Sequence, residues 1–181
     1  MAELSVRAAT VGDAAYVADA QAAAWHDTFG ATLPAALLDQ LRGAAAVEQW
    51  RLAVTDPPTP RHRLLVAVAD ADVVGFAAVG PAGDPDLDQE TDAEIVALSV
   101  QPARGHEGHG SRLVNATVDQ LRSDGFRTAH VWLTETDTVL RAFLERAGWA
   151  DDGARRTLDL HGDATVVVTQ LRLGVAIGDG G

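Results

Sequence analysis

The chain has 181 residues, about one domain on the usual range of roughly 100 to 200 residues, and its composition, 47% hydrophobic and 22% charged, is that of a globular protein. It contains no cysteine, which excludes disulfides, thiolate metal sites and a cysteine nucleophile. With 14 basic against 26 acidic residues the formal net charge is −12, which opposes binding to nucleic acid and to anionic membranes. All the basic residues counted are arginine, so a Schiff-base lysine and a P-loop lysine are also excluded.

No segment has the length and apolar character of a membrane-spanning helix, which needs about 20 residues. The first residues, Met1 to Leu4, lack the basic and then apolar order of a signal peptide. We therefore expect a cytoplasmic protein without nucleic-acid or membrane partners. We also expect one domain over residues 1–177, followed by a flexible tail over 178–181.

The first half of the chain predicts a short strand, three helices and then a hairpin. The strand is expected at 4–7, the helices near 13–27, after Pro34 and around Trp50, and the hairpin strands at 63–69 and 73–80. Thr10 followed by Asp13 is typical of a helix N-terminus. Asp70-Ala71-Asp72 is expected to form the hairpin turn.

Residues 81–92 form an acidic loop with five carboxylates, at Asp84, Asp86, Asp88, Glu90 and Asp92. Such a loop is usually a solvated surface segment. The alternative is a rim that attracts cationic substrates.

The second half predicts a strand–helix–strand crossover and a final hairpin. We expect strands at 94–100 and 128–133, helices around 113–121 and 139–147, and final strands at 154–160 and 164–173. The combination of hairpins with one crossover indicates an α/β protein with a mixed sheet rather than a doubly wound parallel one.

The segment between the strand at 94–100 and the next helix is rich in glycine, at Gly105, Gly108 and Gly110. Glycines let the backbone approach a ligand, and a helix N-terminus offers N–H groups to an anion such as a phosphate. The order G-x-x-G-x-G is the reverse of the dinucleotide-binding pattern, so a dinucleotide enzyme is a distant alternative. A turn needed only for packing is another. His106 and His109 lack the spacing of a metal-binding helix, and we expect no metal site.

An acidic residue on a strand, then Leu-x-Val-x-Pro, an Arg/Gly-rich turn with Gly-x-Gly-Ser and an amphipathic helix, resembles the acyl-CoA-binding core of the GNAT superfamily of N-acyltransferases. The element order from Leu4 to Leu173 and the later Ala147-Gly148-Trp149 are similar to the same family. The resemblance implies the GNAT fold, with a twisted, mostly antiparallel sheet, helices on both faces and two central strands that splay apart beyond Val100.

The resemblance further implies acetyl-CoA as cosubstrate. Its pantetheine would pair with the strand backbone at Leu98, Ser99 and Val100, and its pyrophosphate would lie on the turn and helix start. The residues implied in the turn and helix start are Arg104, Gly105, His106, Glu107, Gly108, His109, Gly110 and Ser111. Asp137 and Phe143 are added from the later helix, although Asp137 is also explained as a first-turn carboxylate.

For catalysis, the resemblance places the N–H of Val100 as donor to the oxyanion and Glu94 as the base that removes a proton from the amine. Partial burial of Glu94 would raise its pKa; the alternative is a solvated acid without a catalytic role. Trp25 and His26 are expected on the acceptor side, although packing roles are the commoner explanation for the tryptophans and histidines. Leu144 stands where the family commonly has the tyrosine that protonates the leaving thiolate.

The predicted activity is therefore transfer of an acetyl group from acetyl-CoA to a primary amine by direct attack in a ternary complex. The acceptor is a small molecule or a protein N-terminus, and the acidic balance mildly favours a cationic one. Because Leu144 replaces the expected acid, a non-catalytic acyl-CoA-binding sensor is the alternative. Exchange of the final strand, or pairing at the sheet edge, through the segment Ala164–Leu173 would form a homodimer, although nothing in the pattern requires one.

Overall fold

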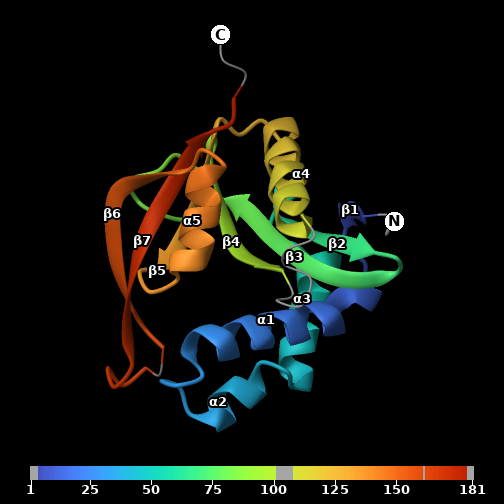
Figure 1. Cartoon of the computed structure of the whole chain (residues 1–181). Helices are drawn as coiled ribbons and strands as arrows, with labels where there is room; N and C mark the ends of the chain where they lie inside the picture. The colour runs from blue at the N-terminus through green and yellow to red at the C-terminus, as the bar shows by residue number, and fades with distance from the viewer. Residues whose placement is uncertain (1–3, 101–107, 161, 179–181) are drawn as a thin grey trace. The chain divides into compact units, whose positions relative to one another are not determined.

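The computed structural model describes residues 4–100, 108–160 and 162–178. Contacts divide the chain into two compact units, drawn together in Figure 1. Unit 1 comprises Met1–Gly80 and Val96–Gln120, and unit 2 comprises Pro81–Ile95 and Leu121–Gly181. The expected single domain over 1–177 remains a prediction.

The sheet of unit 1 begins with three antiparallel strands in the order β1-β2-β3. They are β1 (Leu4–Ala8), β2 (Arg63–Ala69) and β3 (Asp72–Pro81), and the last residues of β4 (Asp92–Val100) also belong to this unit. Asp70 and Ala71 form the predicted hairpin turn, and both have positive φ, 57° and 141°. Short connections of this kind match the twist of paired strands when φ is positive.

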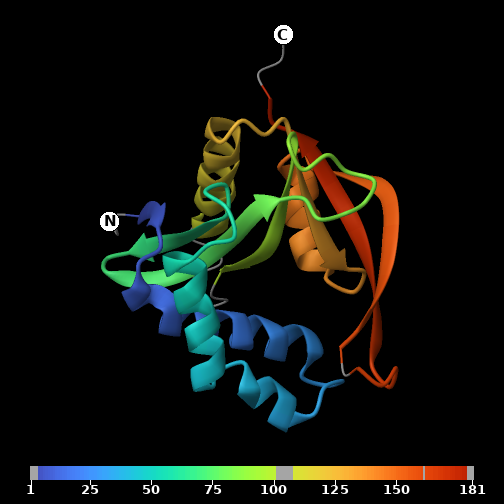
Figure 2. The same ribbon diagram turned by 180° about the vertical axis from the view of Figure 1, so that it is seen from behind.

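The helices of unit 1 cover this sheet on both faces (Figures 1 and 2). They are α1 (Ala14–Phe29), α2 (Ala35–Gln40), α3 (Ala44–Thr55) and most of α4 (His109–Ser123), preceded by a single 3₁₀ turn, η1 (Val11–Asp13). On one face α1 and α3 pack with Val66 and Phe76, and on the other Leu113 of α4 packs with Ala67 and Val74. Covering both faces explains why β2 and β3 are almost continuously apolar.

The start of the first helical segment is fixed by a capping box between Thr10 and Asp13, as the sequence predicted. Arg7 donates two hydrogen bonds to the Asp13 carboxylate, at 2.7 and 3.0 Å, and the backbone N–H of Thr10 donates a third. These donors hold the pKa of Asp13 well below its usual range. The arrangement ties β1 to the N-terminal end of α1.

Unit 2 contains four strands in the order β4-β5-β7-β6, of which β4 contributes its first residues. The others are β5 (Thr128–Thr134), β6 (Ala150–Asp159) and β7 (Val167–Ala176). β4 pairs in parallel with β5, Asp92–Ile95 against Thr128–Val131, and the other pairs of this unit are antiparallel. The chain therefore forms the mixed, mostly antiparallel sheet that was predicted. The splaying of the central strands remains a prediction.

The last two strands differ in extent from the predicted 154–160 and 164–173. β6 begins at Ala150 and passes through a register shift between Asp151 and Arg155, where Gly153 has a φ of 90°. β7 begins only at Val167, because the side chains of Asp159 and Asp163 accept backbone N–H groups in the connection and hold it as an extended turn. The later start of β7 thus comes from short polar side chains that bond to nearby backbone.

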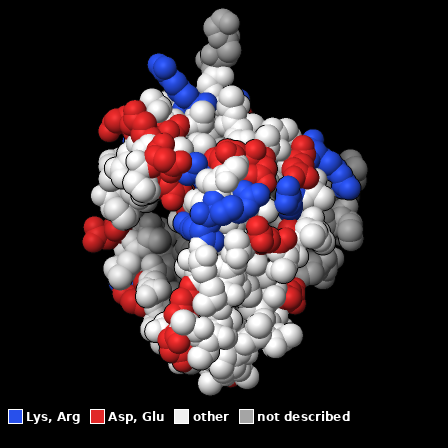
Figure 3. Space-filling view, turned by 90° about the vertical axis from the view of Figure 1, so that its left-hand side faces the viewer, with Lys and Arg blue, Asp and Glu red and all other residues white. Residues whose placement is uncertain are grey.

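The two faces of the unit 2 sheet differ in chemistry. One face carries Val131, Leu133, Leu171 and Leu173, all buried, and α5 (Thr138–Arg146) lies against this part of the sheet in both ribbon views. The other face carries polar and aromatic side chains, described below. Figure 3 shows the side on which β6 lies, where basic and acidic side chains gather next to one another.

β7 lies between β5 and β6 over much of its length, and β6 is the outer strand of unit 2. Where β7 already has a neighbouring strand on each side, it has no free edge for a second copy. The prediction of sheet-edge pairing through Ala164–Leu173 is therefore wrong for that part of the strand. A homodimer formed in another way remains a prediction.

Candidate active site

Glu94 lies on β4, opposite His130 of β5, and its side chain is only partly exposed. Burial raises the pKa of Glu94, and the nearby negative charge of Asp84 raises it further. Arg156, the backbone N–H of Gly83 and Arg172 act in the opposite direction. The partial burial expected from the sequence is therefore present, and it makes Glu94 a better proton acceptor than an exposed carboxylate. The catalytic role of Glu94 remains a prediction.

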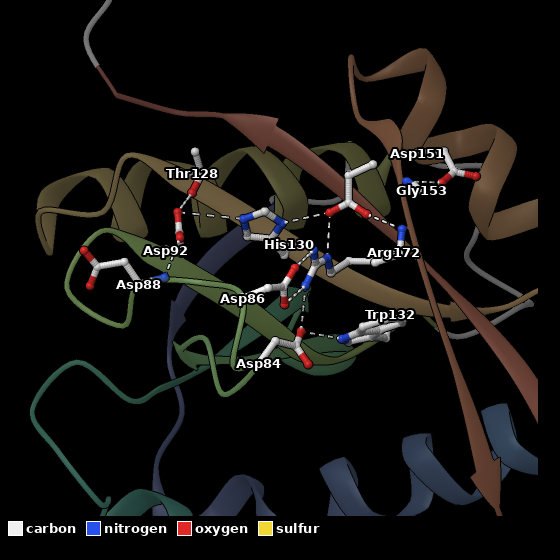
Figure 4. A network of polar contacts seen from close by, with 12 residues as sticks. Asp84, Asp86, Asp88, Asp92, Thr128, His130, Trp132, Asp151, Gly153 and Arg172 are labelled. Atoms are coloured by element: carbon white, nitrogen blue, oxygen red, sulfur yellow. Dashed lines mark hydrogen bonds and ion pairs between the residues drawn. The ribbon is translucent and has the colours of Figure 1, made fainter.

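A polar network centred on Arg172 lies on the face of the unit 2 sheet that also carries Glu94. Figure 4 shows this network. The Arg172 side chain is 5% exposed and donates to Asp84 at 3.2 Å, to Asp86 at 2.9 and 2.6 Å, and to Asp152 at 2.6 Å. Trp132 Nε1 donates to the same Asp84 carboxylate at 2.8 Å. These charge-assisted bonds fix the acidic loop against β5 and β7.

The acidic loop is therefore neither fully solvated nor fully available to a cation. Asp84 and Asp86 are occupied by Arg172, and Asp92 accepts hydrogen bonds from the Thr128 hydroxyl and from the backbone N–H of Asp88. These three carboxylates are therefore not available to a cationic substrate, which weakens the interpretation of the loop as a rim that attracts cations.

His130 lies between two carboxylates on the same face. Its Nε2 is 3.8 Å from Asp92 and its Nδ1 is 3.7 Å from Asp152, and neither nitrogen makes a hydrogen bond to any described residue. Its ring packs on Gly174, where a Cβ would lie 3.1 Å from Nδ1. Burial lowers the pKa of His130 despite the two acids. His130 is thus a buried part of the network.

Arg156 of β6 lies over the ring of Trp132, with its guanidinium carbon 4.4 Å from the ring centroid. Its Nε donates to Gln170 at 2.7 Å. Trp132 itself is partly exposed, so it is not the core residue that the sequence favoured but part of a polar face.

The strand segment predicted to bind the pantetheine, Leu98 to Val100, is the end of β4 and is half-buried within unit 1. Gly75 of β3 lies close to it. A Cβ at Gly75 would be 2.8 Å from the Ser99 carbonyl oxygen and 3.2 Å from the Val100 side chain. Gly75 therefore permits the close approach of this segment to β3, a requirement that sequence reasoning missed.

Of the predicted phosphate-binding turn, the structure describes only the part from Gly108 onward. Gly108 has a φ of 78°, a conformation that favours glycine, and α4 begins at the next residue. His109 is buried, whereas Gly110 and Ser111 are more accessible in the first turn. The predicted ligands Arg104, Gly105, His106 and Glu107 lie outside the described residues.

Asp137 lies at the start of the later helix, α5, and Leu144 near its end. The Asp137 carboxylate accepts the backbone N–H of Leu140 at 3.1 Å and so caps α5, the simpler of the two roles considered for it. Leu144, which the resemblance places where the family commonly has a tyrosine, is fully buried in the core, whereas Phe143 beside it is half-buried. Leu144 is therefore a packing residue.

The predicted acceptor-side residues lie on α1. Trp25 is half-buried and contacts Phe29 edge to face, with centroids 5.3 Å apart, and His26 is exposed. A cavity of about 330 Å³ in unit 1 has Gln21, one turn earlier on α1, among its lining residues, together with Trp50 and His62. Trp50 donates from Nε1 to Gln21 at 3.2 Å. Trp25 and His26 are not among its lining residues.

In the part of the chain that the structure describes, no group of three or more His, Asp or Glu residues is arranged to hold a metal ion. No helix within the same residues is both long and apolar enough to cross a bilayer.

The chain matches the model of the acetyltransferase (GNAT) family over residues 22–149, well over half of its length. It belongs to the GNAT acetyltransferase family and is an acyltransferase. A search of the curated proteins gave no match.

Solved structures similar to this chain share its fold at low sequence identity. The PaiA N-acetyltransferase from Thermoplasma acidophilum in complex with coenzyme A is 14% identical, with a TM-score of 0.71 over 93% of this chain and 98% of that one. YncA from Salmonella typhimurium, with its cofactor acetyl-CoA, is 15% identical, with a TM-score of 0.67 over 99% and 96%. The ribosomal-protein-S18-alanine N-acetyltransferase from Escherichia coli is 13% identical, with a TM-score of 0.66 over 99% and 97%.

The network around Arg172 is the main feature that sequence reasoning did not find. A signal was present, because Arg172 stands between Leu171 and Leu173 in a strand, where a single charge on one face must find partners. Its partners, however, are 20 to 88 residues away in the chain.

Proposed function

We propose that this protein transfers the acetyl group of acetyl-CoA to a primary amine, by direct attack of the amine on the thioester within a ternary complex. The proposal is supported most directly by the position of Glu94, which is half-buried on the strand that continues to Leu98–Val100. This burial raises the pKa of Glu94. Membership of the GNAT family supports acetyl transfer in general. Two similar structures contain coenzyme A or acetyl-CoA, which supports the choice of cosubstrate.

The cosubstrate would bind through backbone groups. The end of β4 offers peptide groups at Leu98 and Ser99 for an extended pantetheine chain. The first turn of α4 offers N–H groups, which have no acceptor within a helix, and the positive end of the helix dipole to the pyrophosphate. The left-handed conformation of Gly108 lets the chain turn into that helix.

In the reaction, the acceptor must arrive as a neutral amine, since an ammonium has no lone pair. Glu94, directly or through a water, takes the proton that the amine loses as its nitrogen bonds to the carbonyl carbon. The Val100 N–H stabilises the oxyanion. The C–S bond then breaks, the amide forms, and the thiolate is released and takes up a proton from solvent, since Leu144 supplies none.

The test is release of free CoA thiol from acetyl-CoA across a panel of primary amines, with Glu94→Gln compared against Glu90→Gln. Glu90 lies in the acidic loop and is exposed, so the same change of charge is made outside the site. Glu94→Gln should lower kcat by roughly 10²-fold or more, the usual contribution of a positioned base, and leave the Kd for acetyl-CoA unchanged. Glu90→Gln should retain activity.

If Glu94→Gln kept full activity, Glu94 would not be the base. Acetyl-CoA binding without thiol release above background for any amine would instead favour the sensor.

A further inference from the structure

Arg156 differs from its neighbours on the last two strands in what it binds. Arg155 pairs with Asp151 at 2.8 Å and with Glu135 at 3.4 Å, and Arg172 pairs with three aspartates. Within the described residues, the contacts of Arg156 are with neutral groups, the amide of Gln170 and the ring of Trp132. The charge of Arg156 is therefore not neutralised by a carboxylate in contact with it.

These two contacts hold the guanidinium in one orientation. Its guanidinium carbon lies over the Trp132 ring and its Nε donates to Gln170, so four N–H groups remain on the two terminal nitrogens. Two such N–H groups in one plane match the two oxygens of a carboxylate or of a similar anion. The residue is exposed, so an anion can reach it from solvent.

Arg156 is on the same face of the unit 2 sheet as the candidate base. Arg156 pairs with Gln170, Trp132 with Arg172 and Glu94 with His130, so alternation places all of these side chains on one face. The positive charge of Arg156 also acts on Glu94, whose pKa it lowers. An acceptor with its amine at Glu94 would therefore present its other groups to the Trp132–Arg156 pair.

We propose that Arg156, held by Trp132 and Gln170, binds an anionic group of the acceptor, and that the acceptor is a small amine that also carries a carboxylate, such as an amino acid. This inference rests on the proposed acetyl transfer. An acceptor with a carboxylate takes the place of the cationic acceptor that the net charge favoured. The carboxylates of Asp84 and Asp86, which could have attracted a cation, are already paired with Arg172.

The experiment compares amino acids with their primary amides as acceptors, measured as kcat/KM from CoA thiol release. The amide keeps the amine and removes the charge. In the wild type the amino acid is used, and in Arg156→Gln its kcat/KM should fall by at least ~10-fold relative to that of the amide, mainly through KM, because charge-assisted bonds are lost. Arg156→Lys should recover part of the loss, since it keeps the charge but not the planar fork.

Arg155→Gln is the matched control, since it is the adjacent arginine on the opposite face and is paired with carboxylates; it should leave the amino acid to amide ratio unchanged. A second measurement uses the wild type alone: short carboxylates without an amine should compete with the acceptor, and their carboxamides should not.

The inference is overturned if Arg156→Gln leaves the ratio as it is in the wild type, or if carboxylates and carboxamides inhibit equally. Absence of thiol release with every amine, despite acetyl-CoA binding, would overturn the proposed function itself and this inference with it.

Discussion

Replacement of Arg172 by glutamine is expected to lower the free energy of unfolding substantially, because this buried guanidinium holds the acidic loop against β5 and β7. Glutamine keeps much of the length of the side chain and removes the charge. Asp84 and Asp152, whose side chains are 17% and 26% exposed, would then lose their cationic partner while remaining largely out of water.

The magnitude follows from these two contacts. A hydrogen bond to a charged group contributes about 1.5–3 kcal/mol, and the bond to Asp152 at 2.6 Å is shorter than that to Asp84 at 3.2 Å. Together they predict a loss of about 3 kcal/mol, the lower end of the range for breaking a buried ion pair by removing one partner. The exposed Asp86 is left out of this sum.

The measurement is urea unfolding followed by far-UV circular dichroism. Arg155→Gln is the control, because Arg155 is exposed and makes similar contacts at the surface, which contribute much less. If Arg172→Gln is no less stable than Arg155→Gln, the network does not hold the loop and the reasoning fails.

Two further variants test the site. Gly75→Val would place a Cβ 2.8 Å from the Ser99 carbonyl oxygen and should raise the Kd for acetyl-CoA, measured by calorimetry, by at least ~10-fold. Gly83→Ala is the control, because a Cβ there has nothing within 4 Å, and it should not raise the Kd. Equal affinities of the two variants would contradict the placement of the cofactor strand. Asp84→Asn removes a negative charge that raises the pKa of Glu94, so the acid limb of the kcat/KM–pH profile should move to lower pH. A shift to higher pH would disprove the coupling.

The elements of the fold could be predicted from local patterns. Apolar spacing placed α1 and α4, the Thr10–Asp13 pair placed the first helix start, and the Asp70–Asp72 segment placed the hairpin. The last hairpin was less accurate, because side chains such as Asp159 accept backbone N–H groups and delay the start of β7. Competition of that kind depends on geometry that periodicity does not contain.

The positions of candidate site residues could be predicted where residues close in the sequence form one strand or the start of one helix. Glu94 and Leu98 to Val100 lie on one strand, and Gly108 directly precedes its helix, as the local pattern indicated. The functional roles of these residues were implied by the family resemblance and remain predictions. The role of Asp137 was decided by a contact only three residues away, its bond to Leu140. Contacts made across strands gave no such local signal.

By itself, the sequence determined the class of chemistry: a cysteine-free acyltransferase with an acid on a strand and a glycine turn before a helix. Only the tertiary structure decided which charges are already paired, because strand pairing brings Arg172 to Asp84, 88 residues away, and leaves Arg156 over a tryptophan. The Coulomb interaction depends on distance in space and on burial, and neither can be read from separation along the chain.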